Sequence, residues 1–214
     1  MTAHRRPQRQ PVDGSRLRWP GAAAGFTLFG EVLWIGVIVT VVGLPLLTLP
    51  AALAAGVRSL RRYLRAERSG LAEFWRDVRS AVLPGMVTAL AVIGALGLIG
   101  ASALVASTTS LPGRELVLVV CALATVAVLT ALVALASLWR PTLGWAEAAR
   151  ALRPALTADV GGTVLLVVAV GLTAIAAWQL PPLIVPALGC LAFAAAVVVE
   201  RRIAREHPLI ESAH

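Results

Sequence analysis

Arginine clusters separate the long apolar stretches of this chain, and this pattern limits what the chain can fold into. All 19 basic residues are Arg, and there is no Lys. Loops rich in basic residues stay in the cytoplasm during membrane insertion. The pattern therefore predicts a multi-pass membrane protein with its arginine clusters on one side and only Arg114 on the other. The four clusters span residues 5–18, 58–79, 140–153 and 201–205.

The amount of charge supports the same class. Hydrophobic residues make up 58% of the chain and charged residues 14%, whereas soluble domains usually carry about a quarter charged residues. The net charge of +8 would also suit nucleic acid, but the arginines border apolar stretches. We therefore expect the arginines to bind the anionic headgroups of a lipid bilayer and not nucleic acid.

Six apolar segments are candidates to cross the membrane, because about 20 helical residues span the roughly 30 Å hydrocarbon core. The second segment is the ambiguous one, since it ends in arginines. It is either a re-entrant stub or a short span whose arginines reach the interface. The span is favoured because it puts the arginines on both sides of the first hairpin in the cytoplasm. The segments are residues 26–44, 46–64, 82–106, 115–139, 160–178 and 183–199.

The predicted fold class is therefore all-α: a polytopic membrane protein of about six transmembrane helices. Both termini are expected to be cytoplasmic. Residues 1–20 are polar and rich in Arg and Pro, which predicts a disordered basic tail. Residues 21–206 form the expected helical membrane domain, and residues 207–214 a C-terminal tail.

A short motif recurs 74 residues further along the chain. Gly-Leu-Ala-Glu at 70–73 corresponds to Gly-Trp-Ala-Glu at 144–147. An apolar stripe at helical spacing follows each copy, which predicts two short amphipathic helices at the cytoplasmic interface; chance similarity between ordinary loops is the alternative. A parallel internal repeat covers about 46–107 and 115–180. The stripes are Leu71, Phe74, Trp75, Val78 and Val82, and Trp145, Ala148, Ala149, Leu152 and Leu156.

Acidic residues inside a membrane are the usual functional candidates. Glu31 and Asp159 are the two that we expect near spans. Glu31 is the candidate functional carboxylate, although a structural role, in which it reaches interfacial water or pairs with an arginine at the membrane boundary, is favoured over a proton or ion site. Asp159 is expected to cap the helix that follows it.

Chemistry-bearing motifs are otherwise scarce. Cys121 and Cys190 lie inside apolar segments, and His4, His207 and His214 lie in the polar tails. Neither pattern suits a metal site, and no nucleophile elbow, zinc-protease motif or phosphate-loop lysine is present. We expect no catalytic residue, no cofactor and no metal, and hence not an enzyme.

The stretch Pro-Leu-Leu-Thr-Leu-Pro-Ala-Ala-Leu-Ala-Ala at 45–55 resembles a signature of the YesL-like family of bacterial integral membrane proteins. Its matching positions form a predicted structural motif of Pro45, Thr48, Pro50, Ala51 and Ala54. The prolines would bracket an external turn, with Pro50 in the first turn of the next helix, where its missing N–H costs nothing. The Thr48 hydroxyl would cap that helix.

Phe74-Trp75-Arg76 also fits the family. The chain departs from the family pattern in the first span, where Glu31 and Trp34 stand in place of the usual Asn, and at Leu49, where Gly is usual. The family has no known biochemical function, and its members often accompany carbohydrate ABC-type transport systems. The resemblance implies a bacterial inner (cytoplasmic) membrane location, with an ABC-type transporter or another membrane protein as partner.

Together these observations predict a non-catalytic accessory or interaction subunit linked to carbohydrate uptake. The alternative is a small-solute transporter or channel built on the parallel repeat. Transporters place polar groups near the membrane midplane, whereas the central parts of these spans are mostly Ala, Val, Leu and Gly. Transport therefore ranks second.

Overall fold

The structure, a computed structural model, describes residues 20–65, 67, 70–108 and 113–211. Within these segments the chain is helical and contains no strand. The predicted N-terminal tail lies outside the described residues except for Pro20, and the last helix continues into the predicted C-terminal tail. The helices are α1 (Pro20–Gly43), α2 (Leu49–Leu64), α3 (Leu71–Thr108), α4 (Arg114–Leu138), α5 (Gly144–Ala158), α6 (Val160–Gln179) and α7 (Ile184–Glu211), with a 3₁₀ turn at Pro181–Leu183 before α7.

Five helical segments are long and apolar enough to cross a membrane, so the all-α, multi-pass class is confirmed. α2 is not one of them. It has 16 residues, about 24 Å at 1.5 Å per residue, and it includes Arg58, Arg61 and Arg62. The described part of the chain thus offers five candidate spans where the sequence suggested about six. They are Phe26–Gly43, Leu71–Thr108, Arg114–Leu138, Val160–Gln179 and Pro181–Arg205.

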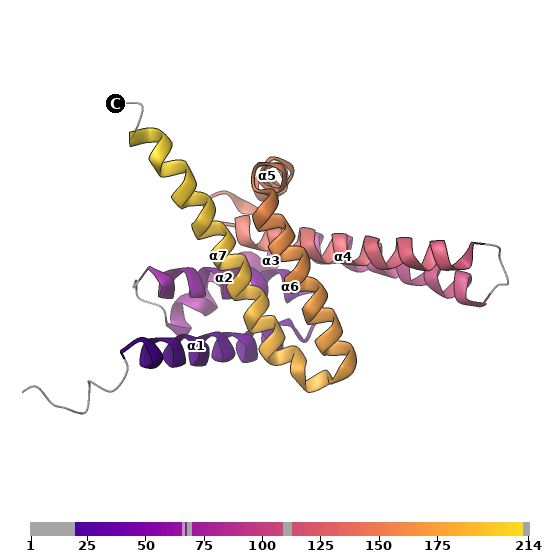
Figure 1. The fold of residues 1–214 in the computed structure, drawn as a ribbon, viewed down its shortest axis with the longest axis horizontal. Helices are drawn as coiled ribbons and strands as arrows, with labels where there is room; N and C mark the ends of the chain where they lie inside the picture. The colour runs from indigo at the N-terminus through magenta and orange to yellow at the C-terminus, as the bar shows by residue number, and fades with distance from the viewer. Residues whose placement is uncertain (1–19, 66, 68–69, 109–112, 212–214) are drawn as a thin grey trace, which may run out of the picture.

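α2 is nevertheless the centre of the fold. Residues 50–57 are all buried, and α2 packs against α1, α3, α4 and α7, as Figure 1 shows. The run Pro-Ala-Ala-Leu-Ala-Ala-Gly-Val explains this position, because small side chains let neighbouring backbones approach closely. At Gly56, an added Cβ would lie 2.7 Å from a methyl group of Val39. The short, charged helix therefore forms the core, and the apolar helices surround it.

α1 and α7 cross at two facing glycines. A methyl group on Gly36 would collide with the carbonyl oxygen of Val185, and one on Gly189 would collide with the carbonyl oxygen of Val32. Two backbones that approach this closely gain dispersion contacts along the crossing, as small residues allow in membrane helix pairs. The crossing joins the first and last helices of the chain.

Of the two predicted amphipathic helices, one is a separate helix and the other is part of a longer one. The second is α5, a separate helix. The first is not separate: it forms the beginning of the 38-residue α3, which continues through Pro84. The second copy breaks at Asp159, whose side chain caps α6. A capped break of this kind is absent in α3, so the first amphipathic segment and the following span stay one helix.

The buried stripe of α3 also differs from the predicted one. The buried positions are Phe74, Asp77, Val78 and Ala81, whereas Leu71 and Trp75 are about half exposed. The helix is rotated so that a carboxylate faces α2 and an indole faces outward. Beyond this segment, α3 and the first half of α4 form a hairpin that extends away from the other helices (Figure 1). Many of its large apolar side chains are exposed, as lipid-facing residues are.

Candidate functional site

The three arginines of α2 and Arg65, which follows its last residue, form two pairs, each spaced four residues apart. Residues four apart share one face of a helix. Arg58 and Arg62 face α3, where both donate to Oδ2 of Asp77, from Nε at 3.2 Å and from Nη2 at 2.7 Å. The carboxylate of Asp77 is only 3% exposed. Buried charged groups in proteins are usually paired and hydrogen-bonded in this way.

The second pair faces α7. Arg61 donates from Nε to Oε1 of Glu200 at 2.7 Å, and Arg65 donates from Nε to Oε2 at 3.1 Å. One short helix therefore binds α3 with one face and α7 with another. These charge-assisted hydrogen bonds link segments that lie 135 and 139 residues apart in the chain.

Asp159 forms a third charged junction, at the start of α6. Its Oδ1 accepts from the backbone N–H of Gly162 at 3.0 Å and from Nη1 of Arg205 at 3.1 Å. The Gly162 N–H lowers the pKa of the carboxyl most; burial opposes this, and the nearby Arg205 adds to the lowering. The predicted helix cap is therefore confirmed. Arg202 lies 3.6 Å from Oδ2, too far for a hydrogen bond.

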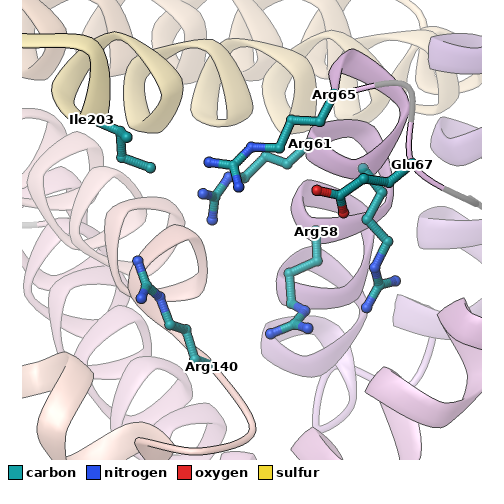
Figure 2. Close-up of a pocket in the computed structure, with 7 residues that line it drawn as sticks. Arg58, Arg61, Arg65, Glu67, Arg140 and Ile203 are labelled. Carbon is teal, nitrogen blue, oxygen red and sulfur yellow. The ribbon is translucent and has the colours of Figure 1, made fainter. Parts of the chain in front are cut away.

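A cavity of about 410 Å³ lies beside α2, and we call it the arginine cavity. Figure 2 shows Arg61 and Arg65 reaching from α2 toward Arg140, with Ile203 of α7 beside them. The five arginines carry five positive charges, and the carboxylates that face them, Glu67, Asp77 and Glu200, carry three negative ones. The lining, counted together with Asp77 and Glu200, which pair with four of its arginines, therefore carries a net charge of +2. The lining residues are Arg58, Arg61, Arg62, Arg65, Glu67, Arg140 and Ile203.

The connection between α4 and α5 places Arg140. Its carbonyl oxygen accepts from the backbone N–H groups of Leu143 at 3.1 Å and Gly144 at 2.9 Å. Gly144 has a φ of 72°, a conformation that glycine adopts without steric cost. The turn holds the exposed Arg140 side chain at the mouth of the cavity, where it makes no ion pair with any residue the structure describes.

Two adjacent tryptophans position Arg58. The guanidinium carbon of Arg58 lies 5.7 Å from the ring centroid of Trp139, within the range of a cation–π contact. The Trp139 ring lies 5.9 Å from that of Trp145, and Nε1 of Trp145 donates to the carbonyl oxygen of Ala81 at 3.1 Å. The first residues of α5 thus reach back to α3 and fix one wall of the cavity.

Glu31, the candidate functional carboxylate, lies away from the arginine cavity. It lines a smaller hollow of about 150 Å³ together with Trp34, Ser59 and Gly70. The sequence favoured a structural role for Glu31, in which it reaches interfacial water or pairs with a boundary arginine. Among the described residues Glu31 makes no ion pair.

The motif of Pro45, Thr48, Pro50, Ala51 and Ala54 lies at the other end of α2 from the cavity. Pro50 is in the first turn of α2, as predicted. The predicted cap is wrong: the Thr48 hydroxyl makes no capping bond to α2. It donates instead to the carbonyl oxygens of Val42 and of Pro45, the latter at 2.8 Å. A hydroxyl that follows a helix end so closely satisfies the unpaired carbonyls there, and Ala51 and Ala54 are buried core residues.

The sequence interpretation missed Asp77 and Glu200, because only Glu31 and Asp159 were taken as acids near spans. A signal for Asp77 was present: it lies three residues after Phe74 and four before Ala81, on the same helix face. The spacing of the three arginines on α2 and of Arg65 just after it was the second signal. Within the described segments, no three His, Cys, Asp or Glu side chains gather as metal ligands.

No family model, no curated protein and no solved structure matches this chain. The resemblance to the YesL-like family therefore stays a prediction.

Proposed function

We propose that this chain is a non-catalytic accessory or interaction subunit of a bacterial cytoplasmic membrane, and that its arginine cavity binds an anion. The observation that carries the proposal is the net positive lining of that cavity. Its walls come from α2, α7 and the segments that follow α2 and α4, so a bound anion would contact several elements at once. The described lining residues supply charge and hydrogen-bond donors, and they include no hydroxyl, thiol or imidazole. This composition favours binding over chemical transformation.

The interior of the helical bundle argues against transport. A cavity of about 210 Å³ between α2, α4, α6 and α7 is lined almost entirely by aliphatic side chains, including Leu53, Leu132 and Val170. A transporter needs polar groups near the midplane to replace the hydration of its substrate. Transport of a small solute therefore remains the second candidate.

The side of the membrane follows from charge. Arg58, Arg61, Arg62, Arg65 and Arg140 come from two of the basic clusters that are retained in the cytoplasm. In this proposal the arginine cavity and both termini face the cytoplasm. A link to carbohydrate uptake, with an ABC-type transporter as partner, rests on the YesL-like resemblance alone.

Two measurements test the proposal. The tagged chain, purified from its native membrane in a mild detergent, should bring down a membrane partner in fixed stoichiometry. The purified chain alone, reconstituted into liposomes, should move neither protons nor sugars faster than empty liposomes. Flux by the purified chain would replace the accessory role with the transporter. A sugar-uptake permease as the partner would support the carbohydrate link, and no stoichiometric partner at all would remove the accessory role.

A further inference from the structure

We propose that the anion bound in the arginine cavity is a phosphate group. This inference rests on the proposed function and names the chemistry of its ligand. It follows from the unused donors of the cavity, from its charge and from its size.

The donors are only partly used by the protein. Each guanidinium carries five N–H groups. Arg58 and Arg61 each give only Nε to a carboxylate, so their terminal nitrogens are left for another acceptor. Arg140, at the mouth, makes no ion pair with any residue the structure describes.

These donors suit phosphate in particular. A planar guanidinium binds two oxygens of one phosphate through a pair of parallel hydrogen bonds. Phosphate presents three or four acceptor oxygens in different directions, whereas a carboxylate presents two in one plane. Guanidinium groups that converge from α2 and from the α4–α5 connection (Figure 2) therefore match a tetrahedral anion better than a flat one.

Charge and size agree with this assignment. The lining together with its paired carboxylates carries a net charge of +2, and a phosphate monoester carries about −1.5 to −2 at neutral pH. Five arginines close together repel one another, and a bound dianion lowers that repulsion. The volume of about 410 Å³ lies within the roughly 300–1,000 Å³ typical of ligand sites. It leaves room for a phosphate and part of the group that bears it, with Ile203 as the apolar contact.

Two kinds of molecule could supply the phosphate group, and the geometry of the cavity fits both equally well. One is the headgroup of an anionic lipid in the leaflet that the arginine clusters face. The other is a soluble phosphate compound. The experiment therefore measures both, using the full chain.

In detergent, inorganic phosphate is titrated against succinate at constant ionic strength, and binding is followed by calorimetry. In nanodiscs, retention of phosphatidylglycerol against phosphatidylcholine is measured by native mass spectrometry. The test variant is Arg140→Gln, which removes one exposed charge at the mouth of the cavity. The matched control is Arg150→Gln, an exposed arginine on α5 whose contact is Glu147, outside the cavity.

We expect wild type to bind inorganic phosphate or to retain phosphatidylglycerol. Arg140→Gln should weaken this by about tenfold, the loss of one charge-assisted contact, and Arg150→Gln should change it by less than about twofold. Saturable phosphate binding identifies the soluble source, and lipid retention alone identifies the headgroup. Preference for succinate over both would overturn the phosphate assignment but leave an anion site. An equal effect of the two variants, or no binding of any of these anions, would overturn the site itself.

Discussion

Replacement of Asp77 by Asn should destabilise this protein far more than a similar change on its surface. Asn keeps the shape of the side chain but removes the charge that Arg58 and Arg62 share. Loss of one partner from a fully buried ion pair costs about 3–5 kcal/mol, because the other charge stays buried and unpaired. The arginine side chains are 23% and 17% exposed, so water screens part of that loss. We expect about 2–4 kcal/mol.

The matched control is Glu147→Gln on α5. It makes the same carboxylate-to-amide change in a pair with Arg150 of similar length, 2.8 Å, but both side chains are at least half exposed. Exposed pairs three residues apart on a helix contribute about 0.5 kcal/mol or less. The two variants therefore share chemistry and charge change, and they differ in burial.

The assay is unfolding of the purified chain in detergent, by heat and by a titration with a denaturing detergent. Asp77→Asn should lower Tm by at least about 4 °C, and Glu147→Gln should leave it nearly unchanged. Adding Arg62→Gln to Asp77→Asn should recover part of the loss, since it removes one unpaired charge. Equal stability of the two single variants would refute the reasoning that Asp77 holds α2 to α3.

Two further predictions concern helix contacts and pH. Gly36→Ala should lower the free energy of unfolding by about 1–3 kcal/mol, because its methyl group would collide with the backbone of α7. The control is Gly30→Ala on the same helix, where the added methyl group meets nothing within 4 Å. This variant should unfold at the same temperature as wild type or slightly higher. The lowered pKa of Asp159 means that its contribution to stability is present above its ordinary pKa of 3.8 and is lost as the pH falls through the lowered value. Tm measured from pH 6 down to pH 2 should therefore fall less steeply in Asp159→Asn, and identical pH profiles would contradict the assignment.

The fold class was predictable because apolar length and arginine placement are properties of sequence alone. The start of α6 was also predictable, because a helix cap is a local interaction: Asp159 caps the helix that directly follows it in the sequence. The role of α2 was not, because its burial depends on which helices surround it. A 16-residue helix with three arginines resembles a weak span in sequence, whereas its small residues make it the element that the longer helices pack around.

The arginine cavity was hidden for a related reason. The sequence interpretation explained the arginines by membrane topology and by contact with lipid headgroups. That explains where the arginines lie along the chain, but not which side chains they contact. Asp77 and Glu200 turn them inward from two different helices. Thr48 shows the same limit on a smaller scale: its position before Pro50 suggested a cap for the next helix, yet its hydroxyl lies nearer the carbonyls of the preceding one.

The last prediction concerns how deeply the α1–α2 hairpin enters the membrane. The positive-inside rule favours both of its ends on one side of the membrane. A hairpin that enters the membrane and returns fits this rule as well as two full spans do. Pro45 and Thr48 line one cavity together with Trp75 and Arg79. These two residues lie in the first turns of α3, at the opposite end of that helix from the tip of the α3–α4 hairpin.

We therefore expect the α1–α2 turn to lie deeper than the tip of the α3–α4 hairpin. The measurement is labelling by a membrane-impermeant maleimide from outside intact cells, after Cys121 and Cys190 are replaced by Ala. Arg114→Cys, at the start of α4, should react quickly because its position is exposed at the hairpin tip. Thr48→Cys should react at least about tenfold more slowly. A free-energy cost of about 1.4 kcal/mol for the reagent to reach the residue is enough for that difference. Equal labelling would place both turns at the outer surface and restore six full spans, with α2 crossing the membrane despite its length of about 24 Å.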